Sequence, residues 1–103
     1  MTAVSEQTPF DYTLSIIGGK WRMKIMYGLA GGKVMRYGEL KREITGITHK
    51  VLSSQLSELE CSGVVKREEY QQIPPKVEYS LTARGNTLMP ILEEMCKWGV
   101  DNQ

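Results

Sequence analysis

Hydroxyl and amine side chains gather on one side of the segment 48–61, THKVLSSQLSELEC. In a helix turning about 100° per residue, its three leucines fall within about 60° of one another, and Lys50 and its three serines share an arc roughly opposite. Short Ser, Thr and Lys side chains reach base edges and phosphates from a helix lying in a DNA major groove. The pattern favours a DNA-contacting helix. An ordinary amphipathic helix with a solvated polar face is the alternative.

The same segment carries its own start and stop signals. Thr48 is a good N-cap, because its hydroxyl can accept a hydrogen bond from a first-turn N–H. Gly63 can adopt the left-handed conformation that ends a helix. Glu58 and Glu60 lie in the second half, away from the N-terminal end that usually enters the groove first.

These residue types give little support to catalysis or metal binding. Ser53 and Ser54 have no activating base nearby in sequence and no nucleophile-elbow motif. His49 is the only histidine and has no second ligand, so we assign it to DNA proximity or to N-terminal packing. There is also no phosphate loop, dinucleotide fingerprint or metal-ligand cluster. We expect no enzyme activity, no cofactor and no metal.

Charge is unevenly distributed along the 103 residues, although the formal net charge is only +1. The segment 20–76 carries 11 Lys and Arg against 6 Glu, a local charge of +5. The two flanks together carry 2 basic and 6 acidic residues, a local charge of −4. An anionic partner would therefore bind the middle of the chain.

Composition is ordinary for one globular domain, with 41% apolar and 24% charged residues. No run of 18 apolar residues could span a membrane, and the N-terminus lacks a signal-peptide pattern, so we expect a cytoplasmic protein. Cys61 and Cys96 lack CxxC or histidine spacing, which predicts buried or semi-buried free thiols rather than a disulfide or a zinc site.

The N-terminal half reads as a loose arm followed by short helices of a single domain, 10–103. Residues 1–9 are polar and end in a proline, which is typical of a flexible arm. Apolar spacing and paired glycines then predict a helix at 11–17, a helix at 20–29, a minimal strand at 34–36 and a helix at 37–44. Two short helices around a Gly-containing turn, the second with a polar face, form a helix-turn-helix pattern.

Two segments rich in Val and Tyr, 64–71 and 76–81, follow the polar helix and are joined by a stiff Ile-Pro-Pro loop. They predict a β-hairpin. A three-helix core followed by such a hairpin is a winged helix, which makes the fold class α+β and mainly helical. Lys66, Arg67 and Lys76 would place charge on this wing, where it meets the sugar–phosphate backbone or a minor groove.

The C-terminal segment predicts one helix from Ala83 to about Trp98, capped by Thr82 and kinked between Asn86 and Pro90. Its apolar stripe exceeds what a terminal helix needs, although simple capping of the core is the alternative. We favour a dimer interface shared with the first helix. The expected interface residues are Tyr12, Leu14, Ile17, Leu88, Ile91, Leu92, Met95 and Trp98.

Three blocks of the chain resemble those of the HxlR-type bacterial transcription regulators. They are YTLSIIGGKWRMKIMYGL, RYGELKREITGITHKVLSSQLSELECSGVVKRE and IPPKVEYSLTARG, and the resemblance covers roughly residues 10–98. It implies a dimeric winged helix-turn-helix protein, with additional N- and C-terminal dimerisation helices, that binds partly palindromic operator DNA. Repression by blocking polymerase is the mechanism we expect.

By position, the resemblance implies that Lys20 and Arg36 approach phosphates, that residues 49–55 occupy the major groove, and that the turn before Lys76 forms the wing. Several family members carry an oxidant-sensing cysteine before the proline that precedes the first helix, but here that residue is Thr8. The expected DNA contacts are Lys20, Arg22, Arg36, Thr48, His49, Lys50, Ser53, Ser54, Gln55, Arg67 and Lys76.

Two other interpretations stay open. A winged helix also serves in protein-interaction modules without specific DNA binding, although the basic middle segment and the serine-rich face argue against this. In addition, a small-molecule effector would fit an adaptable apolar cavity between the core and the terminal helices. Its candidate lining is Trp21, Met26, Tyr27, Met95 and Trp98, which at helical spacing are more often core residues.

Overall fold

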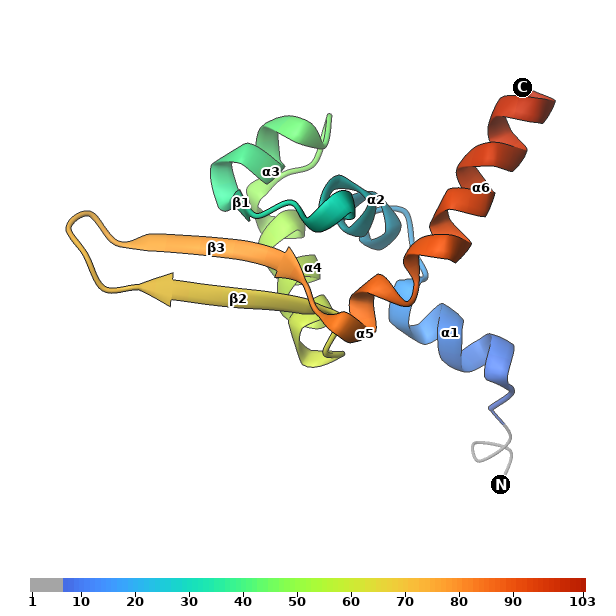
Figure 1. The fold of residues 1–103 in the computed structure, drawn as a ribbon, viewed down its shortest axis with the longest axis horizontal. Helices are drawn as coiled ribbons and strands as arrows, with labels where there is room; N and C mark the ends of the chain where they lie inside the picture. The colour runs from blue at the N-terminus through green and yellow to red at the C-terminus, as the bar shows by residue number, and fades with distance from the viewer. Residues whose placement is uncertain (1–6) are drawn as a thin grey trace.

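The computed structural model describes residues 7–103, which form a helical body and a long β-hairpin (Figure 1). The elements follow in the order α1 (Pro9–Ile17), α2 (Arg22–Gly28), a 3-10 turn (Ala30–Gly32), β1 (Met35–Arg36), α3 (Tyr37–Glu43), α4 (His49–Cys61), β2 (Val65–Tyr70), β3 (Lys76–Leu81), α5 (Ala83–Asn86) and α6 (Met89–Asn102). This order and the small antiparallel sheet confirm the predicted winged helix-turn-helix fold.

Helix α1 begins earlier than the sequence predicts because its first turn is doubly capped. The Thr8 hydroxyl accepts from the Asp11 backbone N–H at 3.0 Å, and the Asp11 carboxylate accepts from the Thr8 backbone N–H at 3.3 Å. Pro9 needs no hydrogen-bond partner for its nitrogen in a first turn. Pro9 therefore belongs to the helix and not to the predicted arm, and residues 1–6 of that arm lie outside the described residues.

Helix α4 has the predicted bounds. The Thr48 hydroxyl accepts from the Val51 backbone N–H at 3.1 Å, and Gly63 follows the helix with φ +79°. The three leucines of α4 are buried, which fixes the rotation of the helix about its own axis. The opposite, polar face is consequently turned outward.

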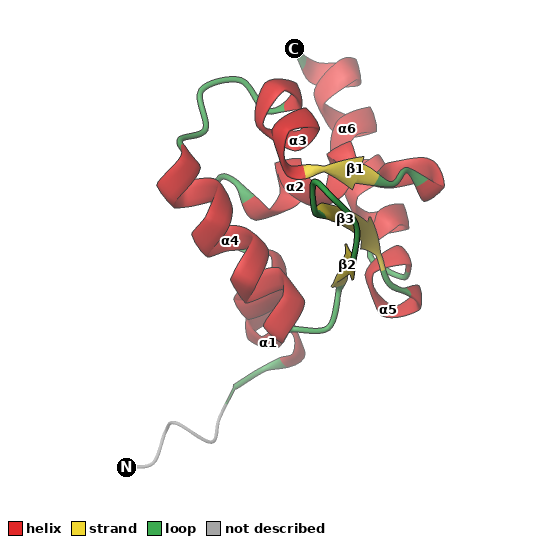
Figure 2. Cartoon of the chain, turned by 90° about the vertical axis from the view of Figure 1, so that its left-hand side faces the viewer, coloured by secondary structure: helices red, strands yellow, loops and turns green. Residues whose placement is uncertain are grey.

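The wing is the hairpin β2–β3, and β1 pairs with the other edge of β3 to give the strand order β1-β3-β2. All pairs are antiparallel, with Val65 opposite Leu81 at one end of the hairpin and Tyr70 opposite Lys76 at the other. The hairpin extends away from the helices, and α1 and α6 lie on the far side of the molecule (Figure 1). Seen from the hairpin tip, α4 and the wing lie in front of α6 (Figure 2).

The predicted single C-terminal helix is wrong, because the chain forms two helices, α5 and α6, separated at Thr87 and Leu88. Pro90 occupies the first turn of α6, where its missing N–H costs nothing, instead of kinking a helix interior. Gly85 lets α5 approach the wing, since a Cβ there would overlap the Val64 carbonyl oxygen. Helix α6 also continues beyond Trp98, to Asn102.

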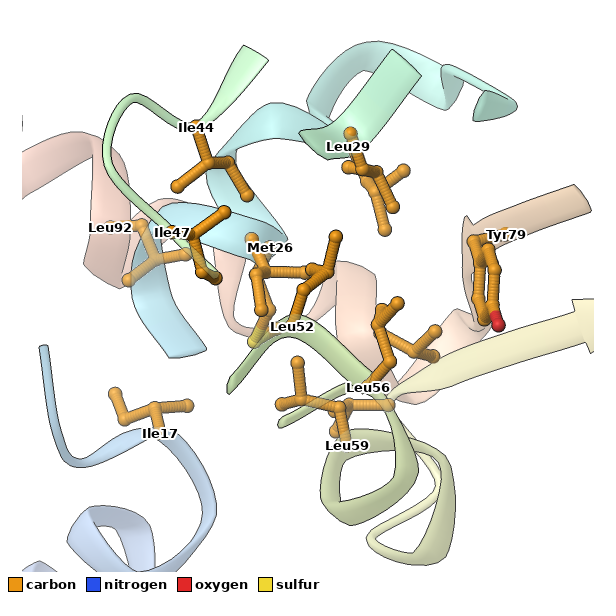
Figure 3. Packing of buried hydrophobic residues seen from close by; sticks show 14 of the residues in the cluster. Ile17, Met26, Leu29, Ile44, Ile47, Leu52, Leu56, Leu59, Tyr79 and Leu92 are labelled. Atoms are coloured by element: carbon orange, nitrogen blue, oxygen red, sulfur yellow. The ribbon is translucent and has the colours of Figure 1, made fainter. Parts of the chain in front are cut away.

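The core lies where α2, α3 and α4 meet the start of the wing, and Figure 3 shows its side chains. Ile25, Met26, Leu29 and Leu52 are among the side chains with no exposed surface. Met26 is therefore a core residue and does not line an open cavity. Cys61 and Cys96, in contrast, are exposed free thiols and not buried or semi-buried, because each lies on a helix surface outside this core.

Candidate nucleic-acid interface

The first two turns of α4 present a polar surface. Thr48, His49, Lys50, Ser53 and Ser54 are all exposed there. The aligned peptide dipoles of the helix make its N-terminal end partly positive. Within residues 7–103, the Lys50 ammonium lies within 4.0 Å of no carboxylate. This surface can therefore donate and accept hydrogen bonds and attract an anion.

Tyr37 positions two of these side chains, a role that the sequence analysis misses. Its ring stacks on the His49 imidazole, with centroids 5.7 Å apart and planes 8° apart. Its hydroxyl donates to the His49 carbonyl oxygen at 3.0 Å and lies 3.2 Å from both His49 Nδ1 and Ser53 Oγ. The position of Tyr37, at the start of the helix before the turn, could have indicated this role. Apolar periodicity predicted only that its ring faces inward.

Arg22 and Gln55 bind each other, although the sequence predicts both as DNA contacts. Arg22 Nε donates to Gln55 Oε1 at 2.8 Å, and its Nη1 donates to the Ser15 carbonyl oxygen at 3.0 Å. The Arg22 side chain is only 19% exposed. Since Nε and Nη1 donate inside the chain, Arg22 joins α1, α2 and α4, and we assign it a structural role in place of the expected phosphate contact.

Lys20 and Arg36 are exposed, as a phosphate contact requires. The Lys20 ammonium lies over the ring of Trp21, 4.6 Å from its centroid, at the N-terminal end of α2. Arg36 immediately precedes α3, and its backbone N–H donates to Glu39 Oε1 at 2.7 Å. That bond anchors the Arg36 backbone and leaves its guanidinium exposed.

The wing carries three cations, but each lies beside a glutamate two residues along the same strand. These ion pairs are Lys66–Glu68 at 3.2 Å, Arg67–Glu69 at 3.3 Å and Lys76–Glu78 at 3.2 Å. The neighbouring Tyr79 hydroxyl, and to a smaller extent the hydrogen bond and charge of Glu69, raise the pKa of Arg67 above its ordinary value. The strands are thus neutral in sum, and Ile73 at the uncharged tip is fully exposed.

A polar hollow of about 380 Å³ separates α4 from the wing. It is lined by Tyr37, Ser53, Leu56, Ser57, Glu60, Arg67 and Tyr79. The structure thus brings Ser53 of the predicted set beside Arg67 of the wing. Lys76, at the distal end of the hairpin, belongs to a separate part of the surface.

The terminal helices expose apolar side chains on the side away from the wing. Tyr12 and Leu14 of α1 and Ile91, Met95 and Trp98 of α6 are 45–70% exposed. Phe10, 72% exposed, and Val100, 66% exposed, add to this surface and were not predicted.

Three of the other predicted interface residues face inward. Ile17 and Leu92 are buried in the core of the chain, and Leu88 packs against it. Leu92 is inward because α6 packs against α2, and Ile17 at the end of α1 joins the same core cluster. The Tyr12 hydroxyl is likewise engaged, since it accepts from Arg84 Nη2 at 2.8 Å.

No helix among the described residues is long and apolar enough to cross a membrane. Across residues 7–103, no group of three or more His, Cys, Asp or Glu side chains is placed to hold a metal ion.

The family model described as HxlR-like helix-turn-helix matches residues 16–103. The chain belongs to this family. An HTH-type transcriptional regulator of Halalkalibacterium halodurans, BH0655, is 64% identical over 95% of this chain and 87% of its own length. A solved structure of a MarR-family transcriptional regulator from Porphyromonas gingivalis W83 is 40% identical, has a TM-score of 0.90 and covers 95% of both chains.

The oxidized form of the redox regulator HypR is also similar to this HxlR-like chain. It is 46% identical, with a TM-score of 0.88, and the match covers 93% of this chain and 98% of HypR. These relatives are transcription regulators by name. In this chain the residue before Pro9 is Thr8, whose hydroxyl caps α1.

Proposed function

We propose that the protein is a sequence-specific DNA-binding transcription regulator that acts as a homodimer. The observation that carries this proposal is the outward polar face of the first two turns of α4, beside a wing, in a chain of a transcription-regulator family. A helix of this kind enters the major groove with its N-terminal end.

In the proposed complex, Lys50 and Ser54 reach base edges, and His49 and Ser53 are held in place by Tyr37. Lys20 and Arg36 contact phosphates on either side of the groove. The neutral strands of the wing contribute less charge than the sequence suggested. Its uncharged tip meets the duplex through apolar and amide contacts, and Lys76, next to the tip, contacts a phosphate.

The exposed apolar side chains of α1 and α6 form the proposed dimer interface. Burying them against a second copy removes from water an apolar surface that a monomer would expose. Two α4 helices related by two-fold symmetry would read half-sites about 34 Å apart, or a multiple of that distance, on one DNA face. Occupying a promoter in this way represses transcription by excluding polymerase.

The test is a fluorescence-anisotropy titration against the upstream intergenic DNA and a scrambled duplex, each at two salt concentrations. Lys50→Gln should weaken binding to the upstream DNA, by about 1–3 kcal/mol if Lys50 reads a guanine. Lys33→Gln is the matched control, since it removes the same charge from an exposed loop position. Equal losses in both variants would remove Lys50 from the base contacts.

The neutral wing favours one rival, a winged helix that binds another protein. That function predicts weak and equal affinity for both duplexes. The affinity should fall with salt in the same way for both, because only non-specific attraction to phosphates contributes. Tight and salt-dependent preference for the upstream DNA would exclude it. If both duplexes bind weakly, a selection of bound fragments from the whole genome distinguishes the two functions. A regulator with a distant operator still enriches one sequence, whereas a protein-interaction module does not.

A further inference from the structure

A hollow of about 700 Å³ lies between α2, the end of α3 and α6. Its apolar lining comes from Met23, Ile44, Leu92 and Met95, and its polar lining comes from Lys20, Lys24, Tyr27, Glu43, Thr45 and Cys96. The volume is in the range of small-molecule sites, which are commonly about 300–1,000 Å³. The mixture of an apolar lining and a few polar groups is also typical of such sites.

Charge in the hollow selects the ligand. Lys20 and Lys24 line the rim of the hollow, with their ammonium groups 4.6 and 5.2 Å from the ring centroid of Trp21, which lies outside the lining. Within residues 7–103, neither ammonium lies within 4.0 Å of a carboxylate. Glu43 is the only acidic residue in the lining, so the two lysines leave a net positive charge.

Two methionines give the apolar part of the hollow an adaptable shape. Met side chains are unbranched and polarizable, and they make favourable contacts with aromatic rings. Met23 projects from α2 and Met95 from α6, so they flank the hollow from two elements. On the polar side, the Tyr27 hydroxyl donates to Cys96 Sγ at 3.7 Å, which leaves its oxygen able to accept a hydrogen bond.

We propose that this hollow binds a small aromatic carboxylate. The ring contacts Met23, Met95 and Leu92, and the carboxylate pairs with Lys24 at the rim. Helix α2 packs against both α4, the proposed groove helix, and α6, part of the proposed dimer interface. A ligand bound here can therefore change the position of α4 relative to α6. The regulatory consequence rests on the proposed function, whereas binding of the ligand itself does not.

The experiment uses the full chain without DNA and 2-naphthoate as the probe, with titration calorimetry and a spectrum of methyl-labelled methionines. Saturable binding should shift the Met23 and Met95 methyl signals and leave Met35, in β1, unmoved. Lys24→Glu should weaken naphthoate binding by about tenfold or more, the effect of losing one charge-assisted contact. Lys33→Glu, with the same charge change outside the hollow, should bind like the wild type.

A neutral analogue, 2-naphthalenemethanol, separates the two parts of the site. It should bind more weakly than naphthoate and equally to the wild type and Lys24→Glu. The proposal is overturned if naphthoate shows no saturable binding, if both lysine variants lose the same affinity, or if Met23 and Met95 do not shift. It is also overturned if a second copy fills the hollow, in which case naphthoate leaves the Met23 signal of the dimer unmoved.

DNA titrations of the same protein keep the two proposals distinct. Operator binding without naphthoate binding would refute only the ligand site. Naphthoate binding with no sequence enriched in the whole-genome selection would instead refute the proposed function and leave the ligand site established.

Discussion

Arg22→Ala separates a structural arginine from a phosphate contact. The substitution removes the donors to Gln55 Oε1 at 2.8 Å and to the Ser15 carbonyl at 3.0 Å. It also removes a side-chain stem that packs between helices, since only 19% of the Arg22 side chain is exposed. The ion pair between Arg22 Nη2 and Glu58, at 3.9 Å, adds little to the free energy of unfolding because 59% of the Glu58 side chain is exposed.

The expected loss is about 2–3 kcal/mol of unfolding free energy, because hydrogen bonds from a charged donor are worth about 1.5–3 kcal/mol each and these are partly exposed. For a domain of this size, 2 kcal/mol corresponds to a fall in Tm of about 8–16 °C. Urea denaturation measures the free energy, at one fixed protein concentration because dimerisation contributes to stability. A double-mutant cycle with Gln55→Ala should show coupling above about 0.5 kcal/mol.

Lys20→Ala is the contrasting variant. Among residues 7–103, the Lys20 ammonium has the Trp21 ring as its one charge-related contact, so the substitution should cost less than about 1 kcal/mol of stability while weakening DNA binding. The reasoning on Arg22 is refuted if Arg22→Ala unfolds within about 0.5 kcal/mol of the wild type. A parallel drop of about one in the salt slope of DNA binding would then identify Arg22 as a phosphate contact.

Three further outcomes follow from the contacts. Tyr37→Phe removes the hydroxyl between His49 and Ser53, so operator affinity should fall with an unchanged salt slope in anisotropy titrations; a changed slope would contradict this role. Lys76→Ala should weaken upstream and scrambled DNA alike and make the salt slope shallower, and a sequence-selective loss would argue for base contact. Trp98→Ala should shift sedimentation towards the monomer, since that side chain is 70% exposed in one chain, whereas unchanged dimer content would place the interface elsewhere.

Elements marked by local signals were predictable to within a residue or two. Thr48 and Gly63 bracket α4, and the Pro-Pro turn separates two strands whose β-branched and aromatic residues favour a sheet. The division between α5 and α6 was not predictable in this way. It depends on the close approach of Gly85 to the Val64 carbonyl, and no periodicity within the helix records that contact.

The candidate site was predicted less completely, because residue type does not reveal which partner a polar group chooses. Arg22 and Gln55 are separated by 33 positions and look like two independent surface groups in the sequence. Likewise, the local charge of +5 counts Lys66 and Arg67 as available, whereas each pairs with a glutamate on its own strand. The exposed face of α4 was predictable because burial of three leucines alone fixes it.

One guanidinium connects the proposed dimer interface to the proposed groove helix. Arg22 Nη1 holds the carbonyl oxygen of Ser15 near the end of α1, and Nε of the same group holds Gln55 in the second turn of α4. Because the guanidinium is planar and rigid, a rotation of α1 against a second copy must either break one of these bonds or carry α4 with it. For two half-sites at a fixed separation, a small displacement of each α4 misaligns both, so the position of α1 would set DNA affinity without any contact between α1 and DNA.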